Sequence, residues 1–390
     1  MTYSQLFKKE KVVRQLSLVQ LIAYFGAWFS NVAIFSMLVE FGASSFTISL
    51  VTAMLFLPAI IISPFSGTLI DRLPLKKLMV TLLSIELIMT IMFLFIGSID
   101  DIWLLCIILF IRMGSASMFF STEMTLLPKV ISGEALQKAN EIHSIIWSFT
   151  YTSGMAVSGI VVALWGTDVA FIIDAFFFIL ALIIFIPIKL DIPVANHTNK
   201  FIEMLKDGFI YTKNSPIIIK MIFLHATVGL TSFDAIITLL ADWEYKTVIA
   251  VPLAIGISNA VRALALMIGP FVVGNIINKN NLGIFFILQG IFIIIWGLTQ
   301  YNFYISLVSL FLVGFLTSTI WSYTYALLQE QTKAEYLGRV LAYNEMIFML
   351  TNVLTALFIG VFASILGLNI VTFILGGLFF VCALWYKKYF

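Results

Sequence analysis

The chain has 390 residues, of which 61% are hydrophobic and only 11% are charged. Soluble domains average about 45–50% apolar and about 25% charged residues, so one globular core cannot bury the excess found here. Lipid must therefore solvate most of the helix surfaces, which excludes an ordinary soluble protein. The formal net charge of +2 excludes little by itself, because the positions of the charges matter more.

Twelve apolar runs are long enough to cross a bilayer, which takes about 20 residues per helix. In chain order they cover 15–40, 46–70, 78–96, 102–126, 140–164, 169–188, 216–240, 248–277, 282–298, 303–329, 344–365 and 370–386. The first run is longer than a signal-peptide core, so we expect it to be retained as a membrane span. The sequence predicts an all-α membrane protein with twelve transmembrane helices in two six-helix bundles.

A polar stretch divides these runs into two groups of six. We predict an N-terminal bundle over 1–189, a linker over 190–215 and a C-terminal bundle over 216–390. Within the linker, Phe201, Leu205 and Phe209 recur every four residues, which predicts a short interfacial helix with one apolar face. Its simplest role is to tether the two halves.

Lysines and arginines gather on one side of this map. If the N-terminus is cytoplasmic, nearly all of them fall on the cytoplasmic side, while Arg112 and Arg262 lie within spans and Lys246 lies outside. The outer turns carry acidic residues such as Asp100 and Asp168 instead. The positive-inside rule then predicts that both termini are cytoplasmic, and we expect a bacterial inner membrane location.

The two halves resemble each other in sequence. Gly67-Thr-Leu-Ile-Asp71-Arg72 after the second run is echoed by Gly274-Asn-Ile-Ile-Asn278-Lys279 after the eighth. Internal duplication around a central cavity is typical of transporters that work by alternating access.

The loop Gly67-x-x-x-Asp71-Arg72-x-Pro74-x-Lys76-Lys77 joins the second and third spans. It resembles the signature loop of the major facilitator superfamily, although Pro74 stands where that family usually has glycine. Gly67 allows close helix approach, Asp71 can face the positive end of a helix, and Lys76 can hold the loop at the anionic leaflet.

The resemblance implies an inner gate on the cytoplasmic face. Glu123, near the cytoplasmic end of the fourth span, is the predicted acceptor for Arg72, as an acid on that helix is in relatives. With Gly67, Asp71 and Lys76 the pair would close the gate when the cavity faces outward. The alternative for Glu123 is a solvated charge at a helix end.

Further residues resemble the macrolide-efflux and enterobactin-exporter branch of drug:proton antiporters. They are Pro128, Leu136, Ala139 and Asn140 before the fifth span, Ile173-Asp174-Ala175 in the sixth, and Leu337-Gly338-Arg339-Val340 before the eleventh. The resemblance implies a monomeric, proton-coupled exporter of amphiphilic drugs, macrolide-like compounds or siderophores. Ala27 stands where the family often has an acid, so the protein would couple through another residue or not at all.

Ionisable residues inside a membrane usually have a partner or a function. Asp234 and Arg262 have matching depths on consecutive spans, which predicts an ion pair; alternatively, Asp234 carries the proton. Arg112 is a further coupling candidate, either handling protons or substrate or pairing with Glu86 on the third span. Glu86 is itself the weakest of these candidates.

Aromatic and polar residues share one face of the first span: Tyr24, Trp28, Asn31 and Phe35. They are candidates for a substrate-cavity wall, with helix packing as the alternative. His225 is a further cavity candidate. It precedes Asp234 by nine residues on one predicted helix and so points to the opposite face, which also fits a buried structural histidine.

No P-loop, metal-ligand spacing or catalytic triad order is recognisable, and Cys106 and Cys382 lie within apolar runs. We therefore expect no enzyme activity, cofactor, metal or nucleic-acid partner. The expected partners are protons, an amphiphilic small molecule and the lipid bilayer. Two alternatives stay open, a facilitator that moves lysophospholipids or other lipids and a non-transporting membrane receptor.

Overall fold

The computed structural model describes residues 2–190 and 201–389, and gives only the backbone at positions 64, 67, 68, 71, 201–205 and 334. Its first half comprises α1 (Tyr3–Lys9), α2 (Lys11–Glu40), α3 (Ser45–Met54), α4 (Leu57–Arg72), α5 (Leu75–Met92), α6 (Ile102–Val130), α7 (Gly133–Trp165) and α8 (Thr167–Phe185). After α9 (Phe201–Lys213) the second half comprises α10 (Pro216–Ala226), α11 (Asp234–Leu240), α12 (Val251–Val273), α13 (Leu282–Thr299), α14 (Phe303–Gln331), α15 (Leu337–Leu366) and α16 (Leu368–Tyr389).

The described residues are helical almost throughout, contain no strand, and include 12 helical segments long and apolar enough to cross a membrane. The predicted all-α class is confirmed. Several helices extend beyond the apolar runs, because polar residues continue the helix at its ends. For example, α7 begins at Gly133, before the run 140–164. Two spans are interrupted: α3 and α4 share the second, and α10 and α11 share the seventh.

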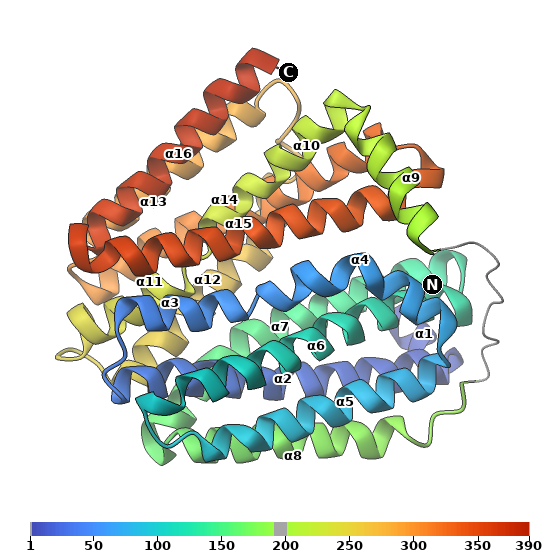
Figure 1. Ribbon diagram of the computed structural model, residues 1–390, viewed down its shortest axis with the longest axis horizontal. Helices are drawn as coiled ribbons and strands as arrows, with labels where there is room; N and C mark the ends of the chain where they lie inside the picture. The colour runs from blue at the N-terminus through green and yellow to red at the C-terminus, as the bar shows by residue number, and fades with distance from the viewer. Residues whose placement is uncertain (1, 191–200, 390) are drawn as a thin grey trace.

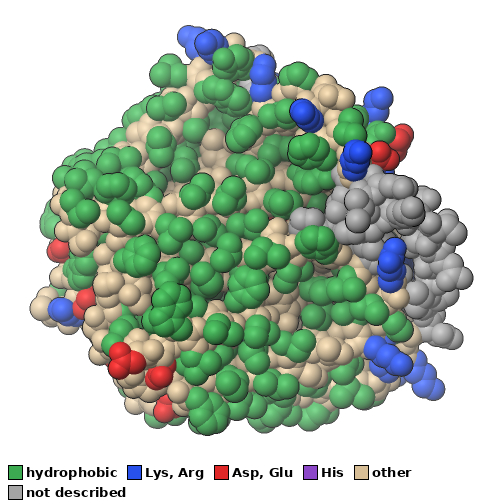
Figure 2. Space-filling view, in the orientation of Figure 1, with side chains coloured by type: hydrophobic (Ala, Val, Ile, Leu, Met, Phe, Trp, Pro, Cys, Tyr) green, Lys and Arg blue, Asp and Glu red, His purple; other side chains and the backbone are tan. Residues whose placement is uncertain are grey.

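Two bundles lie beside each other in Figure 1, one built from α2 and α5–α8 and the other from α10 and α13–α16. In this view the N-terminus and α9 lie towards the right and the C-terminus lies at the top. This upper-right side is called here the terminal side, and the opposite, lower-left side is called the distal side. Hydrophobic side chains cover the middle of the face in Figure 2, with Lys and Arg towards the terminal side and most Asp and Glu towards the distal side. The surface pattern is that of a protein solvated by lipid around its middle.

Internal duplication is visible in the backbone. α6 and α14 are both 29 residues long, and Ile102 and Phe303, at which they begin, are 201 positions apart. The same separation relates Gly166 after α7 to Gly367 after α15, which have φ values of +84° and +87°. Residues 201 positions apart on these helix pairs are therefore structural equivalents.

The two halves approach each other most closely where small residues let helix backbones meet. A Cβ added to Gly256 of α12 would lie 2.6 Å from the carbonyl oxygen of Met155 on α7, and one on Gly360 of α15 would lie 2.5 Å from Ser49 Cβ on α3. Both crossings lie towards the distal side, whereas the bundles diverge towards the terminal side in Figure 1. Backbone contact of this kind is a usual way to pack membrane helices.

We expect Gly256→Leu to destabilise this arrangement, because the neighbouring atoms are backbone and cannot rotate away. Overpacking of this kind costs about 1–3 kcal/mol, so the apparent thermal midpoint of the purified protein should fall by several degrees. Gly377→Leu on α16 is the matched control, since a Cβ there meets nothing within 4 Å. Equal midpoints for the two variants would contradict the close crossing.

Candidate functional site

The seventh span breaks in the middle of the membrane. α10 ends at Ala226, a 3-10 turn covers Thr227–Thr231, and α11 starts only at Asp234. Threonine and serine side chains favour such a break because they compete with the helix for backbone hydrogen bonds, as Thr231 Oγ1 does by donating to the Val228 carbonyl at 2.8 Å. A break frees backbone groups that lipid cannot satisfy, so another part of the protein must satisfy them.

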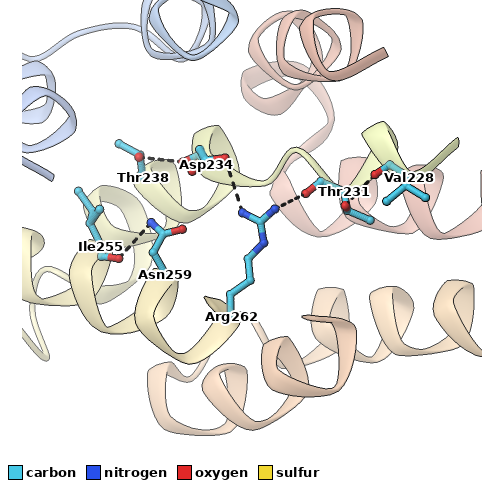
Figure 3. Close-up of polar contacts among 7 residues, drawn as sticks. All are labelled: Val228, Thr231, Asp234, Thr238, Ile255, Asn259 and Arg262. Atoms are coloured by element: carbon cyan, nitrogen blue, oxygen red, sulfur yellow. Dashed lines mark hydrogen bonds and ion pairs between the residues drawn. The ribbon is translucent and has the colours of Figure 1, made fainter. Parts of the chain in front are cut away.

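Arg262 of α12 satisfies the break from the neighbouring span. Its Nη2 donates to the carbonyl oxygen of Thr231 at 2.7 Å, and its guanidinium carbon lies 5.7 Å from the centre of the Phe233 ring. The close-up in Figure 3 shows the guanidinium lying between Thr231 on one side and Asp234 on the other. A largely buried arginine thus stabilises an irregular backbone midway along a span.

Asp234, the first residue of α11, is the second partner of Arg262. Its Oδ2 lies 3.6 Å from Arg262 Nη1, and both side chains are only slightly exposed, at 13% and 11%. That distance is too long for a hydrogen bond, and Nη1 has no other hydrogen-bond partner among the described residues. The structure therefore brings together the two residues whose depths matched in the sequence, as a loose ion pair.

Aromatic residues of the N-terminal half lie next to this pair. Trp28 of α2 stacks on Tyr151 of α7 with ring centres 4.3 Å apart, and Trp147 meets Trp28 edge-on at 6.4 Å. Tyr151 is within electrostatic range of both Arg262 and Asp234. Trp28 Nε1 and Asn31 Oδ1 are buried without a hydrogen-bond partner, so both can bind a ligand or water.

The cavity candidates of the first span thus divide into two kinds. Tyr24, Trp28 and Asn31 are partly exposed, whereas Phe35 is 1% exposed and packs in the hydrophobic core. Trp147 and Tyr151 were not predicted as cavity residues, because α7 carries no spacing pattern that separates wall residues from packing residues.

A second buried arginine belongs to the N-terminal half. Arg112 Nη2 lies 2.6 Å from Asp174 Oδ2 of α8, and Ser30 of α2 also donates a hydrogen bond to Asp174. The rings of Phe93 and Phe178 flank the guanidinium at 5.5 and 5.6 Å. This network joins three helices of one bundle.

The alternative pairing of Arg112 with Glu86 is wrong, because Arg112 pairs with Asp174 instead. Asp174 lies on α8, a helix that was not considered for the pair. Glu86 is 6% exposed and within electrostatic range of Arg112, but it has no hydrogen bond or ion pair among the described residues.

Glu123 lies next to His143 rather than Arg72. Its Oε2 is 3.7 Å from His143 Nδ1, and both side chains are buried. Arg72 is exposed and forms no ion pair with Glu123, and Lys76 is partly exposed. For Gly67 and Asp71 the structure describes only the backbone. The inner gate stays a prediction for a state in which the terminal side is closed.

His225 is fully buried at the end of α10. Its Nδ1 lies 2.9 Å from Thr324 Oγ1, while Nε2 has no partner among the described residues. The rotation argument that placed His225 and Asp234 on opposite faces fails, since the break at Thr227–Thr231 means that the two residues do not share one helix.

The family follows from the comparison of sequences. The sequence profile of the Major Facilitator Superfamily matches residues 16–298. The chain belongs to this superfamily. Its fold and family are those of transporters rather than enzymes, and within the described residues no three His, Cys, Asp or Glu side chains come together as a metal site.

Known proteins resemble this chain along nearly its whole length. Macrolide efflux protein A of Streptococcus pyogenes is 24% identical over 370 residues, which cover 90% of this chain and 89% of that protein. A bacterial homologue of the human lysosomal transporter Spinster, solved in an inward-facing and unoccupied conformation, has a TM-score of 0.77 at 15% identity and covers 97% of this chain and 96% of its own. The nucleoside transporter NupG has a TM-score of 0.75 at 13% identity, covering 97% and 98%.

Removal of either member of the Arg112–Asp174 pair should destabilise the N-terminal bundle strongly. An uncompensated buried charge costs about 3–5 kcal/mol, so Arg112→Met and Asp174→Asn should each lower the thermal midpoint and the yield. The double variant removes both charges and should be more stable than either single variant. If the double variant loses as much stability as the two single variants together, the pairing is contradicted.

Proposed function

We propose that this transporter exports amphiphilic small molecules from the bacterial cytoplasm in exchange for protons. Its superfamily comprises transporters, and its relative from Streptococcus pyogenes is named for macrolide efflux. Trp28 is partly exposed and Trp147 is exposed. Both support an amphiphilic substrate, because flat apolar rings with polar edges bind such molecules without a strict geometry.

We further propose that the terminal side faces the cytoplasm in a bacterial inner membrane and that the protein works as a monomer. The concentration of Lys and Arg on the terminal side supports this orientation (Figure 2). A substrate taken up there would move towards the distal side, where the glycine crossings of α7 with α12 and of α3 with α15 would have to open.

The Asp234–Arg262 pair carries the proposal for coupling. A 3.6 Å ion pair at a helix break holds α11 to α12, and α12 packs on α7 of the other half. Protonation of Asp234 would remove the attraction, while Arg262 would keep its 2.7 Å hydrogen bond to Thr231. α11 could then shift relative to α12, which changes the relative stability of the inward- and outward-facing states.

Arg112 fits coupling less well under this proposal. Its charge is matched by Asp174 at 2.6 Å within one bundle, so it braces helices that move together. We therefore assign the proton to Asp234.

Asp234→Asn should abolish transport driven by a pH gradient while leaving energy-independent exchange of substrate intact. The measurement uses proteoliposomes with an acidic lumen and a panel of a macrolide, a neutral amphiphile and a lysophospholipid. Asp242→Asn is the matched control on the same span, since Asp242 only pairs with exposed Lys246 at 3.0 Å near the distal end.

Liposomes that contain Asp234→Asn protein also correct for passive trapping of weak bases in the lumen. Accumulation equal to that of wild type would remove Asp234 from coupling. Movement of lysophospholipid alone, without response to the pH gradient, would favour a lipid facilitator instead.

A further inference from the structure

An acidic side chain on α15 is left without a partner at the level of the membrane. Glu345 is only partly exposed, and it has no hydrogen bond or ion pair with any described residue. It lies at the start of the eleventh apolar run, 344–365. An unpaired carboxylate that is partly removed from water is energetically unfavourable, so such a residue usually has a function.

Two other acids within the spans have neighbours that account for them. Asp174 pairs with Arg112, and Asp234 pairs with Arg262. Glu345 has no such ion pair among the described residues, and Lys220 of the same bundle lies over the ring of Tyr389, at 4.6 Å from its centre. Glu345 is therefore available to pair with a positive charge on a ligand.

Aromatic rings surround this region of the C-terminal bundle. Trp321 and Tyr325 of α14 stack with ring centres 5.1 Å apart and planes 11° apart. His225 packs at 5.4 Å against Trp321, Tyr325 and Phe348, and Phe348 lies one turn after Glu345 on α15. Tyr325 is within electrostatic range of Glu345. The rings of Trp321, Tyr325 and Phe348 are all partly exposed, so they are open to a ligand.

The duplicated half shows that the fold does not need this acid. Ser144 of α7 is 201 positions before Glu345, and Phe120 of α6 is 201 positions before Trp321. The equivalent location in the N-terminal bundle therefore keeps an aromatic residue but has a neutral serine in place of the carboxylate. An acid that packing does not require points to a ligand.

We propose that Glu345, together with Trp321, Tyr325 and Phe348, binds the positively charged group of the exported amphiphile, a protonated or quaternary amine. A carboxylate supplies the counter-charge, and aromatic faces attract organic cations without the dehydration that a bare metal ion demands. The cluster lies in the terminal-side parts of α14 and α15, where a substrate from the cytoplasm arrives first. This inference rests on the proposed export of amphiphiles and names the class of substrate.

Tetraphenylphosphonium tests the proposal, because it is a permanent cation and exchanges no proton. Binding of the radiolabelled ion to the full chain in nanodiscs should weaken about tenfold or more in Glu345→Gln, the order expected for loss of a charge-assisted contact. The neutral triphenylphosphine oxide should compete with the radiolabelled ion equally well in wild type and in Glu345→Gln. Glu330→Gln is the matched control, since Glu330 is an exposed acid on α14 that pairs with Lys279, and it should bind the cation as wild type does.

Glu345→Ser provides a second variant, because the equivalent helix of the other half carries serine there and folds. It should lose the cation to the same degree as Glu345→Gln, whereas Glu345→Asp should retain most of the affinity. Unchanged binding of tetraphenylphosphonium in Glu345→Gln and Glu345→Ser, or no binding by wild type, would overturn the proposal. If the same preparation still transports the neutral amphiphile, only the cation site is rejected and the proposed export remains. If it transports nothing, the proposed export is rejected as well.

Discussion

The absence of water at mid-membrane is the constraint on which this structure depends. Every backbone group freed by a helix break and every buried charge must find its partner inside the protein. Arg262 meets both requirements at once, since it donates to the Thr231 carbonyl and faces the Asp234 carboxylate. The break in the seventh span is therefore tied to one arginine on the next span.

The two halves use buried arginines differently. In the N-terminal bundle, Asp174 holds Arg112 at 2.6 Å and also accepts a hydrogen bond from Ser30, so a carboxylate is bound from two helices. In the C-terminal bundle, Arg262 and Asp234 are 3.6 Å apart and the stronger contact goes to the backbone. A loose pair beside a helix break can rearrange at lower cost than a tight pair between continuous helices, which suits a moving part.

Hydropathy and charge placement predicted the number of spans and the all-α class, because lipid imposes a simple rule on helix length and composition. Depth matching also predicted the Asp234–Arg262 pair, since both residues lie on consecutive spans. It did not predict the partner of Arg112, because Asp174 lies on a helix distant in sequence. The helix-rotation argument for His225 failed, because no pattern marked the break at Thr227–Thr231. Side-chain partners across helices depend on helix rotation, which a single sequence determines poorly.

The central claim is that Asp234 exchanges its proton as substrate binds. It is tested most directly by measuring protons released when a macrolide is added to the purified transporter in a weakly buffered solution with a pH indicator. The account predicts release by the wild-type protein that Asp234→Asn abolishes, with substrate still bound. Equal proton release by the two proteins would contradict it.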